Sequence, residues 1–226
     1  LAIVRDFPEV RLVEIPNSEF GHGRTRNLAA DLARGEFVAF LTHDAIPAHE
    51  KWATGLTAPF KISSEIVAVM GKQIPRRGCV PIIKYEIQGL FAGLGSDFGE
   101  TVYELLPEDE GNEGIISAKA FYSDVNSVAR RSFLREVVPY RDVRYAEDQL
   151  FGRDLLEAGY KKAYAPAGAV EHSNDLTLEE YGARIFDETV ALREIGRDIR
   201  PLSARSRVKL TAVGAIRDTA RILRDR

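Results

Sequence analysis

The first half of the chain alternates helical patterns with short apolar runs. Residues 10–16 are expected to form a short strand, and residues 24–35 a helix whose apolar face carries Leu28 and Leu32. The continuous apolar run at residues 37–41 is too short for a helix and is typical of a strand covered on both faces. This strand–helix–strand succession predicts an α/β protein with a mostly parallel central sheet flanked by helices.

The same alternation continues along the chain with one interruption. Residues 75–120 lack a clear period and are expected to form long loops around one helix at residues 85–94. Long loops in a compact enzyme are often functional lids, although disorder is the alternative. Further on, Thr177 and Glu180 have the spacing of a capping box and predict the start of a helix. The other expected elements are helices at residues 48–60 and 146–160, strands at residues 65–74 and 161–173, and a strand followed by a helix over residues 120–137.

The last part of the chain is basic and has a helical period. Residues 200–226 hold eight Arg or Lys and two Asp, a net charge of +6, whereas the rest of the chain carries −9. A basic amphipathic helix is typical of an element that lies on an anionic membrane surface. The alternative is a helix that packs on the domain or forms the contact of a homodimer. The apolar positions of one helical face are Val208, Ala212, Ala215, Thr219 and Ile222, flanked by Ile216 and Leu223.

Length and composition fit one α/β domain with an appendage. The 226 residues are 45% hydrophobic and 29% charged, which is ordinary for a globular protein. We divide the chain into a domain at residues 1–196 and a basic helical tail at residues 197–226. The lone cysteine, Cys79, excludes an internal disulfide and fits a reducing, cytoplasmic setting. The acidic body, whose basic residues show no aromatic interleaving, argues against nucleic-acid binding.

Acidic and histidine side chains stand at the ends of the predicted elements, where α/β proteins bind their ligands. Asp44 follows the strand at residues 37–41, Glu147 and Asp148 open a helix, and His172 ends a strand. A carboxylate with an imidazole suits Mn²⁺ or Mg²⁺ bridged to phosphates, and an Asp at a helix start can act as a general base. Each residue also has a structural alternative, because acidic residues favour first helical turns and most buried histidines are simply hydrogen bonded.

Two blocks of sequence resemble family 2 glycosyltransferases, in particular bacterial rhamnosyltransferase-like enzymes that build cell-wall or surface polysaccharide. In FGHGRTRNLAADLARGEFVAFLTHDAIPAHEKW, residues 20–52, an Arg-Asn pair opens the helix, and the next strand ends in Thr-His-Asp where the family has an Asp-x-Asp type metal motif. In YAEDQLFGRDLLEAGYKKAYAPAGAVEHSNDLTLEEY, residues 145–181, a Glu-Asp pair and a later histidine match the family. The resemblance covers roughly residues 5–190 and implies a GT-A fold.

The resemblance also implies roles for single residues. Asp148 would be the catalytic base, with Glu147 positioning a sugar. Asp44 and His172 would hold the divalent cation, Mn²⁺ or Mg²⁺. The residues implied at the donor are His22, Arg26, Asn27, Thr42 and His43. The residues implied at the acceptor are Asp124 and Asn126, from a segment that resembles the acceptor side of the family, and Trp52, whose alternative is a place in the core.

The implied reaction is an inverting, metal-dependent sugar transfer from a nucleotide-sugar donor, a dTDP- or UDP-sugar, with dTDP-L-rhamnose favoured. The acceptor would be a glycan or a polyprenyl-diphosphate-linked glycan at the inner face of the plasma membrane. Family members begin with a nucleotide-binding strand–helix–strand unit, which is expected to be missing in front of Leu1. Two other classes stay open. They are a sugar-nucleotide nucleotidyltransferase or hydrolase that uses the same metal site, and a non-catalytic carbohydrate-binding remnant.

Overall fold

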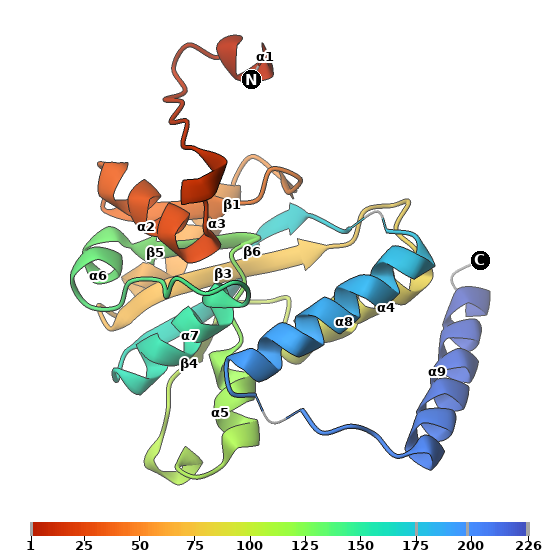
Figure 1. Ribbon diagram of the computed structural model, residues 1–226. Helices are drawn as coiled ribbons and strands as arrows, with labels where there is room; N and C mark the ends of the chain where they lie inside the picture. Colours follow the sequence, from red (N-terminus) through yellow and green to blue (C-terminus); the bar gives the residue numbers. More distant parts are fainter. Residues whose placement is uncertain (1, 175, 198, 225–226) are drawn as a thin grey trace.

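The computed structural model describes residues 2–174, 176–197 and 199–224, and it shows a central sheet with helices around it (Figure 1). The first residue and the last two residues of the predicted tail lie outside these ranges. The strands follow the order β1-β5-β3-β6-β2, and β4 pairs with β6 beside this path. Their bounds are β1 Phe37–Leu41, β2 Ile46–Pro47, β3 Ile66–Ile74, β4 Thr101–Tyr103, β5 Asn126–Arg130 and β6 Lys161–Glu171.

Most of the strand length points one way, although the pairing is mixed. β3 and β6 are parallel neighbours, whereas β5 lies between β1 and β3 and is antiparallel to both. Consequently β1, β3 and β6 share one direction, as the strand–helix–strand pattern predicts, while β2, β4 and β5 run against them. The α/β sheet flanked by helices is confirmed. Adjacent strands of the sheet are nevertheless mainly antiparallel. One reason is that β5, which comes later in the chain, lies between β1 and β3 and runs against both.

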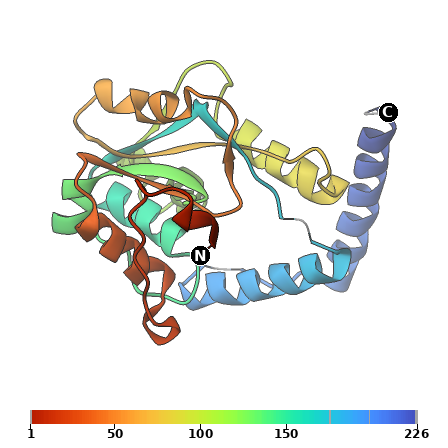
Figure 2. The same cartoon turned by 90° about the horizontal axis from the view of Figure 1, so that it is seen from above.

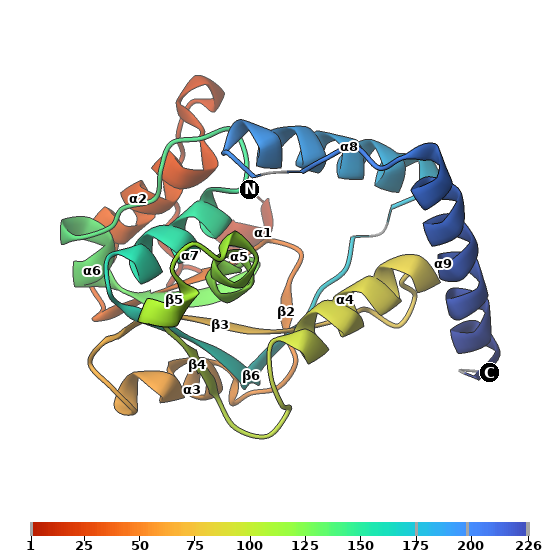
Figure 3. The ribbon, with the colours of Figure 1, turned by 90° about the horizontal axis from the view of Figure 1, so that it is seen from below.

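Helices cover both faces of the sheet. The α-helices are α1 Ala2–Arg5, α2 His22–Leu32, α3 Trp52–Thr57, α4 Pro81–Gly93, α5 Glu113–Ala120, α6 Arg131–Glu136, α7 Glu147–Glu157, α8 Leu178–Glu194 and α9 Ala204–Arg224, and the 3-10 turns are η1 Asn17–Glu19, η2 Ala58–Lys61 and η3 Pro107–Asp109. On one face, α2, α6 and α7 bury Ala30, Phe133 and Phe151. On the other, α3 and η2 bury Leu56 and Phe60, and Figure 3 shows α3 and α7 on opposite sides of the sheet. This double cover explains the continuous apolar runs of β3 and β6, which are buried on both faces. The edge strand β1 is buried on alternate residues only, contrary to the expectation from its apolar run.

The structure changes two expectations and confirms a third. Residues 11–16 carry no regular structure, because no strand in the described part of the chain pairs with them. Residues 75–120 are more ordered than expected and hold α4, β4, η3 and α5. The capping box is confirmed, since the Thr177 hydroxyl accepts from the Glu180 N–H at 3.2 Å and the Glu180 carboxylate accepts from the Thr177 N–H at 2.8 Å.

The described chain ends in α9, which stands at one margin of the molecule beside α4 (Figures 1 and 2). The segment between α8 and α9 contains the predicted boundary at residue 196, which stays a prediction. No helix within the described residues is both long enough and apolar enough to cross a membrane.

Close packing of α7 on the end of α5 generates a first prediction. We expect Gly152→Ala to lower the free energy of unfolding by about 1–3 kcal/mol. The reason is that an added Cβ would lie 2.2 Å from the Ala120 carbonyl oxygen. Equilibrium unfolding in urea measures this change.

The matched control is Gly89→Ala in α4, where an added Cβ would meet nothing within 4 Å. Alanine restricts the unfolded chain more than glycine does, so this variant should gain about 0.5–1 kcal/mol. The same change in unfolding free energy for both variants would contradict the close contact between α7 and Ala120.

Candidate active site

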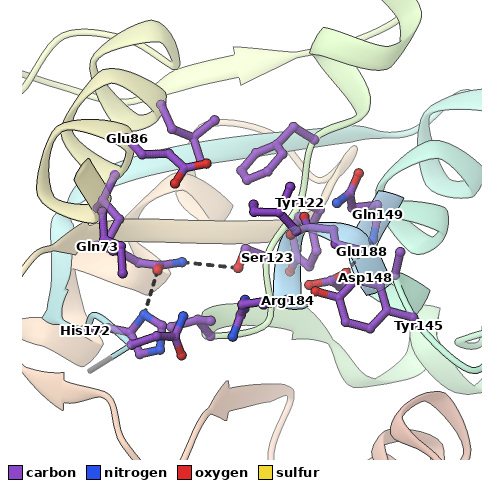
Figure 4. A pocket seen from close by; sticks show the side chains of 18 of the residues that line it. Gln73, Glu86, Tyr122, Ser123, Tyr145, Asp148, Gln149, His172, Arg184 and Glu188 are labelled. Atoms are coloured by element: carbon purple, nitrogen blue, oxygen red, sulfur yellow. Dashed lines mark hydrogen bonds between the residues drawn. The ribbon is translucent and has the colours of Figure 1, made fainter. Parts of the chain in front are cut away.

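A pocket of about 300 Å³ opens at one edge of the sheet (Figure 4). The carboxyl ends of β1, β3 and β6 meet the start of β5 at this edge, because β5 runs against them. The walls come from α4, α7 and α8 and from the segment before β5. The polar side chains of the lining are His22, Arg26, Gln73, Glu86, Ser123, Tyr145, Glu147, Asp148, Gln149, His172, Asn174, Tyr181, Arg184 and Glu188.

Arg26 of α2 is paired with two acidic residues beside the pocket. Its Nε lies 3.0 Å from Asp124 Oδ2, and its Nη1 donates to Glu147 Oε1. Asp124 is 1% exposed and also accepts hydrogen bonds from the hydroxyls of Ser127 and Tyr140, at 2.5 and 2.9 Å. A buried carboxylate needs such partners, because an unpaired charge in the interior is strongly destabilising. Arg26 therefore ties α2 both to the segment before β5 and to the start of α7.

Asn27, next to Arg26, holds the segment that leads into α7. Its side chain donates to the Tyr140 carbonyl oxygen at 2.8 Å and accepts from the Tyr140 N–H at 2.9 Å. The Arg26 guanidinium also lies 5.6 Å from the centre of the Tyr140 ring. The observed partner of Asn27 is thus the protein backbone, and Asn27 lies outside the pocket lining.

Ala146 makes the turn that starts α7. Its φ of 60° lies in the left-handed region, and it is the one non-glycine residue with positive φ within the described residues. For alanine this conformation costs about 1 kcal/mol. Such strain is found where the surrounding structure enforces it, often at functional sites. Here the turn places Glu147 and Asp148 in the first turn of the helix, whose free N–H groups favour negative charge.

Asp148 faces the pocket from this first turn (Figure 4). Its Oδ1 accepts from the Gln149 N–H at 2.8 Å, and its Oδ2 accepts from the Asp124 N–H at 3.3 Å. Burial, and after it the negative charges of Asp124 and Glu147, raise the pKa of Asp148 to about 7. A carboxyl group in this range can take a proton from a substrate at neutral pH.

Asp44 and His172 come together beyond the ends of β1 and β6. Asp44 Oδ2 lies 3.3 Å from His172 Nε2, and His172 Nδ1 lies 2.9 Å from Gln73 Oε1. The amide nitrogen of Gln73 donates to Ser123 Oγ at 3.2 Å, so its oxygen is left to accept from His172 Nδ1. This tautomer leaves the Nε2 lone pair facing Asp44. Burial lowers the pKa of His172, although Asp44 raises it in part, and this favours the neutral ring.

The paired Asp44 and His172 are a donor set that fits a divalent cation. Carboxylate oxygen and neutral imidazole nitrogen are ligands of Mn²⁺, and the hydrogen bond from Nδ1 to Gln73 is the outer support that such histidines have. No group of three or more His, Cys, Asp or Glu side chains suited to a metal occurs within the part of the chain described. Two protein ligands leave the other coordination positions for substrate oxygens.

The remaining residues implied at the donor lie at varying distances from the pocket. His22 lines it at the start of α2. Thr42 and His43 belong to the loop that leads to Asp44, where His43 is exposed, and neither lines the pocket. Burial raises the pKa of Asp44, but the Thr42 side chain and His172 outweigh it and hold this pKa below its usual value.

Two residues implied at the acceptor lie within the body of the protein instead. Trp52 Nε1 donates to Asn126 Oδ1 at 2.8 Å. Asn126 is 1% exposed and donates to the Gly168 carbonyl oxygen at 2.6 Å. The pair joins α3, β5 and β6 and takes no part in the pocket lining, so their place at the acceptor stays a prediction. Asp124, the third such residue, is enclosed behind Arg26 and acts on Asp148 through its backbone N–H.

Several pocket residues were missed by the sequence analysis. Gln73 is the next-to-last residue of β3, and Arg184 and Glu188 come from α8 (Figure 4). The spacing of Tyr181, Arg184 and Glu188 places them on one helical face, which is the signal that could have identified them. Nothing in the local pattern shows that α8 folds back over the pocket.

Comparisons with known proteins identify the family of the chain. The sequence profile of glycosyl transferase family 2 matches residues 1–138. The chain is 28% identical over 190 residues to O-antigen chain rhamnosyltransferase RfbN of Salmonella typhimurium, and 29% identical over 181 residues to O-antigen chain rhamnosyltransferase WbaN of Salmonella anatum. These matches cover 83% and 79% of this chain but 57% and 54% of the relatives, so the chain spans about half of their length.

A solved structure supports the expected GT-A fold. The mannosyltransferase PcManGT from Pyrobaculum calidifontis, in complex with GDP-Man and Mn²⁺, matches with a TM-score of 0.56 and 14% identity. The match covers 88% of this chain and 50% of that one, and at this identity it shows the fold alone. The expected GT-A fold and the expected family are confirmed, and the chain belongs to glycosyl transferase family 2.

Proposed function

We propose that this protein transfers a sugar from a nucleotide donor to a glycan hydroxyl, with inversion at the anomeric carbon. The observation that carries the proposal is Asp148, a carboxyl with a pKa of about 7 that faces a pocket bordered by His172 and, behind it, Asp44. The names of the two relatives support a rhamnosyl donor and an O-antigen type acceptor. dTDP-L-rhamnose is the donor that we propose. A polyprenyl-diphosphate-linked glycan is the form of acceptor we propose.

Asp148 is the base in this proposal. Its carboxylate takes the proton of the acceptor hydroxyl while that oxygen forms a bond to the anomeric carbon. The bond from this carbon to the diphosphate oxygen breaks on the opposite face, and its electron pair leaves with the nucleoside diphosphate. Because the acceptor oxygen attacks directly, no covalent intermediate on the protein is needed. Glu147 and Asp124 raise the basicity of Asp148 through their charge.

Asp44 and His172 would hold the divalent cation, Mn²⁺ or Mg²⁺. When bound there, the cation supplies positive charge to the diphosphate leaving group. Gln73 keeps the His172 ring in the tautomer that presents Nε2, and Ser123 in turn fixes the Gln73 amide. Arg76 braces the same loop, since it donates to the carbonyl oxygens of Asp44 and Ser173. These contacts prepare the two ligands before substrate arrives.

Replacement of the base gives the first test of the reaction. We expect Asp148→Asn to lower kcat at least about 100-fold, because asparagine keeps the shape of the side chain and cannot accept the proton. Transfer is measured with dTDP-L-rhamnose, Mn²⁺ and a lipid-linked or soluble glycan acceptor. Turnover at the wild-type rate would overturn the assignment of Asp148.

Stability of the same variant provides its control. A carboxyl whose pKa is higher in the folded than in the unfolded chain destabilises the folded state as pH rises from about 4 to 7. Asparagine has no such charge, so Asp148→Asn should melt at the same temperature as wild type or a higher one at pH 8. A loss of activity at an unchanged or raised melting temperature therefore reports chemistry and not unfolding.

The pH dependence of kcat/KM gives a further prediction. The base works only when deprotonated, so we expect kcat/KM to fall below a pKa of about 7, by roughly tenfold for each pH unit. Glu147→Gln removes a negative charge beside Asp148, so the fall in kcat/KM should begin at a lower pH in this variant. A fall at the wild-type pH would contradict the contribution of the Glu147 charge to the raised pKa of Asp148.

A further inference from the structure

Helix α9 packs on the body of the protein through a mixed set of residues. Gly214, Asp218, Ala220, Arg221 and Ile222 are half-buried, and the helix contacts α4. The Arg221 guanidinium lies 5.2 Å from the centre of the Tyr85 ring of α4, and Asp218 pairs with Arg217 at 2.9 Å. Figures 2 and 3 show α9 at the margin, next to the end of α4.

Most of the large apolar side chains of α9 nevertheless are exposed and do not pack on the protein. Val208 and Ile216 are each 71% exposed, and Leu223 is 65% exposed. At about 100° per residue these three side chains lie on one half of the helix, together with Ala212. A surface helix of a globular protein normally turns this half toward the core. The orientation observed here leaves an exposed apolar stripe, and such a stripe marks a surface that contacts a membrane or another protein.

The charges around this stripe indicate what covers it. Arg205 and Lys209 lie on the same half of the helix near its start, and Arg217 and Arg224 border it, all of them exposed. Long basic side chains beside apolar ones keep their charge at lipid headgroups while their stems lie against the acyl region. Residues 200–226 carry +6 on a body that carries −9, so attraction to an anionic surface acts on this helix and not on the rest of the chain.

We propose that α9 lies along the surface of an anionic lipid bilayer, with Val208, Ile216 and Leu223 inserted among the lipids. The helix has 21 residues, a length of about 31 Å, and it lies in the plane of the interface. Its contacts with α4, among them Arg221 on the Tyr85 ring, keep it joined to the protein, so the bilayer and the protein body occupy opposite sides of one helix. This inference deepens the proposed function, because it places the pocket near a lipid-linked acceptor, but the binding itself needs neither donor nor acceptor.

Vesicle flotation of the chain, without any substrate, tests the proposal. We expect co-flotation with vesicles of equal parts phosphatidylcholine and phosphatidylglycerol, and much less with phosphatidylcholine alone or at high salt. Ile216→Glu should weaken partition at least about tenfold, because it puts a charge in the centre of the apolar stripe. The matched control is Ile62→Glu, the same exchange at a 59% exposed isoleucine outside α9, which should float as wild type does.

Three outcomes would overturn the proposal. They are no flotation of the wild type, equal flotation of Ile216→Glu and wild type, and a dimer in sedimentation without lipid that Ile216→Glu dissociates, which would assign the stripe to a second copy. Transfer to a water-soluble acceptor separates this proposal from the proposed function. Ile216→Glu should retain wild-type transfer there, whereas a wild type that floats and transfers nothing would refute the reaction and leave the membrane contact intact.

Discussion

The charge of Arg26, shared between two buried acids, is the constraint around which the site is arranged. One guanidinium from α2 pairs with Asp124 before β5 and with Glu147 at the start of α7. These segments are far apart in sequence, and each brings a carboxylate that could not be enclosed without a cation. The pocket edge therefore depends on charge neutrality: α2, β5 and α7 have to meet in this arrangement for the acids to be buried at all.

The same arrangement separates the roles of three neighbouring acids. Asp124 and Glu147 take the available positive charge, and the hydroxyls of Ser127 and Tyr140 complete the bonding of Asp124. Asp148 receives only backbone N–H groups and stands beside two negative charges. Burial first, and then the charges of Asp124 and Glu147, raise the pKa of Asp148. The proton affinity of Asp148 therefore depends on its enclosure as well as on the two acids beside it.

Local pattern predicted much of the fold, because short apolar runs and capping leave clear marks, as in the strand at residues 37–41 and the capping box at Thr177. That strand lies at the edge of the sheet and is buried on one face, so its expected cover on both faces was wrong. The position of Asp44, Asp148 and His172 at element ends was predictable too, and the structure has Asp148 and His172 in the pocket lining with Asp44 beside His172. What local pattern could not show is long-range placement. Trp52 looked like a platform for a sugar, yet it bonds to Asn126 within the protein, and Arg184 reaches the pocket only because α8 folds back over it.

The left-handed turn at Ala146 has one more consequence. Rotation of this residue into an ordinary backbone region would release energy locally, so the start of α7 is under tension in the resting protein. The restraints that oppose this release are the two hydrogen bonds of Asn27 to Tyr140 upstream and the pair of Arg26 with Glu147 downstream. Two adjacent residues of α2 thus restrain the turn, one before it in the chain and one after it. A displacement of α2 would weaken the contacts of Asn27 and Arg26 together. The first turn of α7 would then be free to move as a unit.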